Sequence, residues 1–121
     1  MDVIFQFGDL QVNAEFNDSN TAHVIYDALP MDAKVNCWGE EIYFEIPAKL
    51  AAEDATLDLK VGDIGYWPEG ACLCLFFGKT PASIDERPRP ASEVTLVGTF
   101  LAPLDRLRKV DSGTKVRVFK E

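Results

Sequence analysis

The residues best suited to chemistry gather in segments that are rich in aromatic and turn-forming residues. One segment is 36–44, NCWGEEIYF, and another is 62–70, GDIGYWPEG, which leads into 75–81, LFFGKTP. Aromatic side chains with polar tips are common in ligand pockets. The segments therefore predict an aromatic pocket with a few polar groups. Its candidate ligand-binding residues are Glu41, Tyr43, Tyr66, Phe77, Lys79 and Thr80.

Each candidate also has a purely structural interpretation. The aromatic residues and the Lys79-Thr80 pair fit a core or scaffold as well as a pocket. Glu40 and Glu41 are adjacent, so on a strand they point to opposite faces and form no general acid–base pair by themselves. Glu41 belongs either to a solvated strand face or to a site that recognises a hydrogen-bond donor or a cation.

Other arrangements that would indicate catalysis are missing from the sequence. The one histidine, His23, lies four residues before Asp27, a spacing that pairs the two on a helix surface. No serine lies in a recognisable nucleophile setting beside it. The string Gly78-Lys79-Thr80 would need a glycine at position 73 to end a phosphate-binding loop, and that position is Leu73. The sequence predicts no catalytic residue.

The three cysteines indicate packing and not metal or redox chemistry. Cys72 and Cys74 form a C-x-C string and Cys37 stands alone, which is neither a disulfide framework nor a C-x-x-C motif. On a strand, Cys72 and Cys74 share a face with Phe76, where they would act as small apolar filling. We expect reduced thiols, no metal site and no cofactor.

The elements that must position the candidate pocket are mainly β-strands. Hydrophobic residues alternate with period two along most of the chain, and Gly8-Asp9 fits the turn of a hairpin. The segment 71–77, ACLCLFF, is apolar on both faces, so it needs cover on both sides. The predicted strands are centred on 3–7, 10–16, 42–46, 71–77, 94–100 and 116–118.

Two segments have helical features instead. In 18–29 the apolar residues follow helical spacing, with polar residues to cap the start and Pro30 to stop the continuation. The second, 103–110, begins with a proline. About seven or eight strands and two short helices favour one mainly β domain over 1–121, built as a closed or nearly closed barrel. The proline-rich segment 78–92 is either a binding loop or a stiff connector.

Composition excludes several classes of function. The chain has 121 residues and a net charge of −8, which disfavours nucleic acid as a partner. No apolar run is long enough to cross a bilayer, and the start lacks the basic flank of a signal peptide. We therefore expect a cytoplasmic protein without a membrane or nucleic-acid partner; the sequence leaves its oligomeric state open.

Three strings carry a resemblance to a known family. They are N-x-W-G-E-E-I-Y-F at 36–44, G-D-I-G-Y-W-P at 62–68 and C-L-F-F-G-K-T-P at 74–81, and P-A-S at 90–92 fits as well. The chain resembles a family of small prokaryotic proteins of unknown function with a cyclophilin-like fold. The resemblance implies a closed eight-stranded barrel with two short helices, and a shape grouped with prolyl isomerases.

The residues that prolyl isomerases of this shape use for catalysis cannot be matched to positions of this chain. Cyclophilins use an arginine on a barrel strand with aromatic residues, a glutamine and a histidine around it. Here only Arg117 lies on a predicted strand, whereas the glutamines lie in the first hairpin and His23 lies on a helix. An efficient prolyl isomerase is therefore not expected.

Three functions remain as hypotheses. The first is a binding module for a small molecule or short peptide, which uses the aromatic pocket. The alternative is a peptidyl-prolyl cis-trans isomerase with a non-standard site, which rests on fold analogy. The second alternative is a partner-binding protein that uses an acidic face, because the acidic excess lies within residues 1–70.

Overall fold

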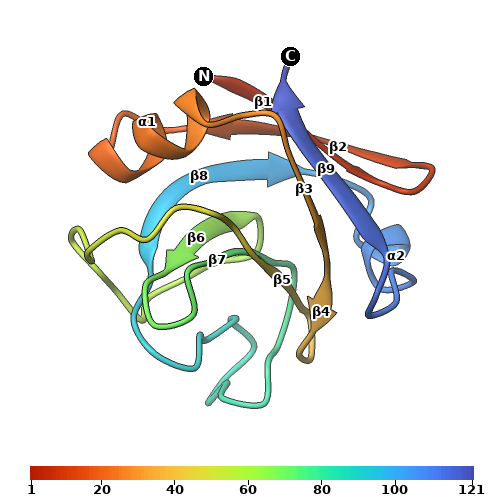
Figure 1. Cartoon of the computed structure of the whole chain (residues 1–121). Coiled ribbons are helices and arrows are strands. Elements are labelled where there is room, and N and C mark those ends of the chain that lie inside the picture. Colours follow the sequence, from red (N-terminus) through yellow and green to blue (C-terminus); the bar gives the residue numbers. More distant parts are fainter.

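The chain is mainly β, with nine strands and two short helices in the computed structural model, which describes residues 1–121. Figure 1 shows the strands wrapping around a common interior. The elements in chain order are β1 (Asp2–Phe7), β2 (Leu10–Phe16), α1 (Asn20–Asp27), β3 (Met31–Lys34), β4 (Asn36–Cys37), β5 (Glu41–Glu45), β6 (Asp63–Trp67), β7 (Cys72–Phe76), β8 (Thr95–Leu101), α2 (Leu104–Leu107) and β9 (Lys115–Lys120).

All strands belong to one antiparallel sheet that curls into a nearly closed barrel. Its order is β3-β9-β1-β2-β8-β6-β7-β5-β4. The two ends of this order, β3 and β4, follow each other in the chain and are separated only by Val35. The same stretch of chain thus pairs with β9 through β3 and with β5 through β4.

The prediction of a closed eight-stranded barrel is therefore wrong in two details. The structure has nine strands, and the barrel is completed through one continuous segment of chain and not by a ladder between its end strands. β4 has only two residues, which is too short for a period-two pattern to show in the sequence. At the junction, the Val35 N–H donates to the Thr114 carbonyl instead of to a neighbouring strand (2.9 Å).

The first hairpin follows the sequence closely. Phe7 pairs with Leu10, so Gly8 and Asp9 form the two-residue turn that the sequence predicts. Gly8 has φ of 56°, a left-handed conformation that glycine adopts without strain. Along β2 every second residue is buried, which confirms the half-buried strand. The inward side chains join a core that contains an edge-on contact between Phe5 and Phe44.

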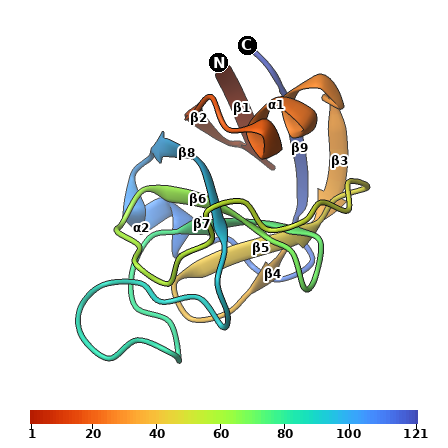
Figure 2. The same ribbon diagram turned by 90° about the vertical axis from the view of Figure 1, so that its left-hand side faces the viewer.

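β7 has the two covered faces that its sequence requires. Leu73 and Leu75 point into the barrel core. The alternate residues Cys72, Cys74 and Phe76 form a second cluster on the outer face, which confirms the prediction that both thiols act as apolar filling. Figure 2 shows this part of the sheet together with the long loop after β7, which projects from the barrel. The outer cover that β7 needs is thus made by loop segments.

The helices are shorter than their predicted ranges of 18–29 and 103–110. α1 begins after Ser19, whose hydroxyl accepts from the Ala22 N–H (3.1 Å). His23 pairs with Asp18 at 3.2 Å, so the predicted pairing with Asp27 is wrong. The chain is extended at Ser19, which brings Asp18 beside the first turn of the helix. No helix of the structure is both long enough and apolar enough to span a membrane.

Candidate functional site

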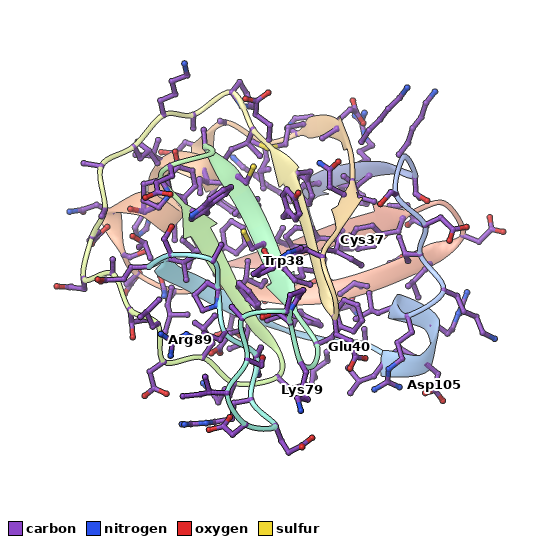
Figure 3. The ribbon with its side chains drawn as sticks, turned by 90° about the horizontal axis from the view of Figure 1, so that it is seen from below. Cys37, Trp38, Glu40, Lys79, Arg89 and Asp105 are labelled. Atoms are coloured by element: carbon purple, nitrogen blue, oxygen red, sulfur yellow. The ribbon has the colours of Figure 1, made fainter.

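A hollow with a mostly hydrophobic lining lies on the outer face of β5, β7 and β6, beneath the segment 90–94. Its volume is about 240 Å³, and six of its eight lining residues are hydrophobic. Figure 3 views the molecule from below, with Trp38 over the strands, Glu40 toward α2 and Arg89 on the side away from α2. The lining residues are Trp38, Glu41, Tyr43, Trp67, Cys74, Pro90, Ala91 and Val94.

Strand register brings the floor of this pocket together. Tyr43 on β5 stands opposite Cys74 on β7, and Gly65 on β6 stands opposite Cys74 from the other side. A Cβ atom on Gly65 would lie 2.8 Å from Cγ2 of Val94. The missing side chain at Gly65 therefore lets Val94 pack down against the sheet, where it closes one wall of the pocket.

The turn between β4 and β5 supplies Trp38 and Glu41. The Trp38 N–H donates to the Glu41 carbonyl (2.9 Å), which closes the turn. Gly39 has φ of 60°, and a Cβ atom there would lie 2.9 Å from the Lys79 carbonyl oxygen. Glycine is thus required both by conformation and by the close approach of the two segments. The Glu40 N–H donates to the same Lys79 carbonyl (2.8 Å), so the turn is attached to the loop after β7.

The aromatic walls are held by contacts with one another and with the 90–94 segment. The rings of Tyr43 and Trp67 meet edge to face, with centroids 6.5 Å apart and planes at 81°. Nε1 of Trp67 donates to Oγ of Ser92 (2.6 Å), which fixes the indole and attaches the segment to β6. Both rings remain half-buried, so part of each faces the pocket.

Glu41 is the only formally charged residue of the lining. It is 6% exposed and makes no ion pair. Burial raises the pKa of its carboxyl to about 7, although a hydrogen bond with the Cys74 thiol favours the ionised form. Burial, followed by the nearby Glu41, raises the pKa of Cys74 well above its usual range. For Cys72, burial and then the charges of Glu45 and Glu41 raise the pKa to about 11.

Of the six residues predicted for the pocket, Glu41 and Tyr43 line it. Tyr66 and Phe77 do not, because both side chains are buried in the barrel core. The Tyr66 hydroxyl donates to the Ala48 carbonyl (2.8 Å) and accepts from the Leu50 N–H (2.9 Å), a role in holding the chain after β5. Side chains alternate along a strand, so Tyr66 points inward and Trp67 points into the pocket.

Lys79 and Thr80 lie in the loop after β7 and not in the pocket lining. Nζ of Lys79 is exposed and lies 3.7 Å from a Glu86 carboxylate oxygen. The buried Thr80 hydroxyl donates to the Arg89 carbonyl and accepts from the Ala82 N–H (3.2 Å). Thr80 thus ties the two ends of the loop together immediately before Pro90, which forms the pocket wall.

Sequence reasoning did not select the other six lining residues. Trp38 and Trp67 belong to the aromatic segments, and the sequence analysis interprets Cys74 as small apolar filling of a strand face. The remaining three come from the 90–94 segment, which is far from β5 in the sequence. The P-A-S string at 90–92 is the signal that could have found them, since it accompanies the aromatic strings in the resemblance.

No lysine or arginine lines the pocket. Beside its rim, Glu40 pairs with Arg108, which also reaches Asp105 (2.8 Å). Arg117, the arginine on a strand, pairs with Asp32 at 2.9 Å on β3 and β9, outside the pocket. No group of three or more His, Cys, Asp and Glu side chains is placed to hold a metal ion. The pocket therefore contains one carboxyl that exchanges a proton near neutral pH, surrounded by aromatic rings.

Comparisons with known proteins agree with this architecture. A family model described as Cyclophilin-like matches residues 1–119, which confirms the resemblance inferred from the sequence strings. The solution structure of a hypothetical protein from Archaeoglobus fulgidus is similar, with 34% sequence identity and a TM-score of 0.84. That similarity covers 100% of this chain and 95% of the archaeal one. The comparison with curated proteins found no match.

Proposed function

The chain belongs to the cyclophilin-like family, and from that premise we propose that it is a binding module for a small molecule or short peptide. The ligand occupies the pocket between the outer face of β5, β7 and β6 and the 90–94 segment. A shared fold does not identify an activity, so the proposal is argued from the site.

The observation that carries the proposal is the make-up of the pocket. Binding sites for small ligands are concave and mostly apolar, with a few polar groups that set orientation. This pocket has that character, with three aromatic rings and one buried carboxyl. Its volume of about 240 Å³ is just below the range of roughly 300–1,000 Å³ that is common for ligand sites. The size suits a small molecule, or one or two side chains of a peptide.

The pocket is poorly equipped for prolyl isomerisation. Rotation about an Xaa-Pro bond has a barrier of about 18–20 kcal/mol, which an isomerase lowers by aiming a fixed donor at the prolyl nitrogen. The five arginines all lie outside the lining, and Glu41 carries its proton only below about neutral pH. We therefore propose binding without catalysis.

The test is a screen of fragments and short peptides against the isotopically labelled protein, read by chemical-shift changes. We expect hits to shift the signals of Trp38, Tyr43 and Trp67. The variant Ala91→Phe adds a ring at an exposed position of the lining and should abolish binding of these hits. Ala51→Phe, at an exposed position outside the pocket, is the matched control and should bind as the wild type does.

Two outcomes would contradict the proposal. In one, hits shift signals elsewhere on the barrel and leave the three aromatic residues unchanged. In the other, the same hits bind Ala91→Phe as well as they bind the wild type. Either result would move the site away from this pocket.

A further inference from the structure

Glu41 differs from the other deeply buried carboxylate of the chain in having no cationic partner. Asp63 is 2% exposed and accepts from Nζ of Lys60 (3.0 Å) and from the Lys60 N–H (2.9 Å). Glu41 is 6% exposed, and no lysine, arginine or histidine pairs with it. A buried charge is costly unless it is paired. When Glu41 is ionised, its carboxylate therefore has no positive charge beside it.

None of the surrounding elements supplies that charge. On β5 the neighbours on the same face are Tyr43 and then the exposed Glu45, and on β7 they are the thiols of Cys72 and Cys74. The 90–94 segment contributes only Glu93, which is exposed.

The basic side chains of the adjoining segments are directed elsewhere. Lys79, whose carbonyl accepts from the Glu40 N–H, has its Nζ 3.7 Å from a Glu86 carboxylate oxygen. Arg89, which precedes the 90–94 segment, lines a neighbouring shallow hollow. Arg108 is engaged with Glu40 and Asp105. A positive partner for the ionised Glu41 can therefore come only from outside the chain.

The other lining side chains suit a cation as well. The negative face of an aromatic ring attracts ammonium groups, most strongly where water is excluded. Trp38, Tyr43 and Trp67 surround the space into which Glu41 opens. The indole of Trp67 is held by Ser92, so part of the site is already ordered before a ligand arrives, which reduces the cost of binding.

We propose that the pocket binds an organic ammonium group on a short aliphatic stem, with its positive charge between the Glu41 carboxylate and the rings of Trp38, Tyr43 and Trp67. The inference rests on the proposed function and narrows its ligand class. The aliphatic stem lies against Pro90, Ala91 and Val94, which form the apolar side of the pocket. The net charge of −8 draws cations toward the protein as a whole.

The carboxyl must ionise for this contact to form. Its pKa of about 7 means that cation binding below neutral pH releases a proton, and that affinity rises with pH. The Cys72 and Cys74 thiols stay neutral over this range because burial raises the pKa of both. A neutral ligand that accepts a hydrogen bond from protonated Glu41 would show the opposite dependence.

The test compares choline with 3,3-dimethyl-1-butanol, its uncharged carbon analogue, in titrations followed by chemical shifts. Choline keeps its charge at every pH, so any pH dependence belongs to the protein. We expect the analogue to bind about thirtyfold more weakly, the ratio expected for a desolvated cation–aromatic contact. Choline should bind about tenfold more weakly at about pH 6 than at about pH 8, because Glu41 is then mostly protonated.

Glu41→Gln keeps the shape of the side chain and removes the charge, so it should weaken choline binding about tenfold or more and abolish its pH dependence. Glu45→Gln, on the same strand but exposed and outside the pocket, is the matched control and should bind choline unchanged. Trp67→Leu, which keeps an apolar side chain without the ring, should also weaken the binding of choline more than the binding of the neutral analogue.

The results separate this inference from the proposed function. Equal binding of choline and its analogue at the three aromatic residues would overturn the ammonium inference and leave the pocket as a binding site. Tighter binding at low pH would overturn it as well, because protonated Glu41 would then be donating to the ligand. Failure of choline to shift any pocket signal would also overturn the inference, while the fragment screen with Ala91→Phe judges the pocket independently.

Discussion

Replacing Glu41 by glutamine should stabilise the fold at neutral and alkaline pH, and much less at acidic pH. In the folded protein burial holds the pKa of Glu41 at about 7, against 4.5 for an ordinary glutamate. The folded state therefore retains a proton that the unfolded state has lost between these two values. Stability falls with rising pH wherever the folded state binds more protons. The stabilising contribution of protonated Glu41 is fully present below about pH 4.5 and is lost as pH rises through about 7.

The size of the effect follows from the difference between the two pKa values. Each pKa unit corresponds to about 1.4 kcal/mol, so an ionised Glu41 costs the folded state about 3 kcal/mol at about pH 8. Near pH 5 the cost is about 1 kcal/mol. The glutamine side chain cannot ionise and keeps the same shape. The free energy of unfolding of Glu41→Gln should therefore exceed that of the wild type by a margin that grows with pH toward about 3 kcal/mol.

The assay is urea unfolding at several pH values between about 4 and 8, followed by tryptophan fluorescence and analysed by linear extrapolation. Glu45→Gln is the control, because its carboxyl is exposed and its replacement should change stability by less than about 0.5 kcal/mol. A difference between Glu41→Gln and the wild type that stays constant across this pH range would refute the argument, since it would show that Glu41 ionises in the folded protein without a desolvation cost.

Three further predictions concern the loop, the thiols and the isomerase hypothesis. Thr80→Val removes the hydroxyl that donates to the Arg89 carbonyl. It should lower the free energy of unfolding in urea by about 1–3 kcal/mol and speed proteolytic cleavage within the loop. An unchanged cleavage rate would contradict the role of Thr80. Exposed Cys37 should react with a disulfide reagent at once in the native protein. Cys72 and Cys74 should react only after unfolding, because they are buried and their pKa values are raised. Three thiols that react equally fast would show that the outer face of β7 is accessible to the reagent. Exchange NMR on short Xaa-Pro peptides should show no faster cis/trans exchange with the protein than without it, because no arginine faces the pocket; acceleration that Ala91→Phe abolishes would establish an isomerase with a different donor.

Several local features of the fold followed from the sequence. The alternation of apolar and polar residues fixes which face of a strand is buried, and β2 has that pattern. The continuous apolar run of β7 required cover on both sides, and the structure has a core cluster on each. The short β4 escaped prediction because two residues carry no periodicity. Whether a strand could be predicted therefore depended on whether it is long enough to show a hydrophobic pattern.

The selection of Tyr66 over Trp67 for the pocket shows a limit of that reasoning. Two adjacent aromatic residues on a strand must face opposite sides, but the sequence does not say which side is the barrel interior. The register decides it, because β6 pairs with both β7 and β8, and its register with β8 shifts between Ile64 and Gly65, where β8 holds the extra residue Val97. Tyr66 therefore became a core residue with a structural hydroxyl, and its neighbour Trp67 became a pocket wall.

The sequence by itself determined the strand-rich architecture, the first hairpin, the family and the aromatic segments from which part of the pocket is built, because these depend on short-range periodicity and on contiguous strings. Only the tertiary structure decided that Glu41 is buried without a cation and that the 90–94 segment forms the pocket with it. Both results depend on contacts between residues far apart in the sequence, where long-range strand pairing and loop closure set the environment of a side chain. The chemistry of Glu41 is therefore a property of its surroundings in the fold and not of its position in the sequence.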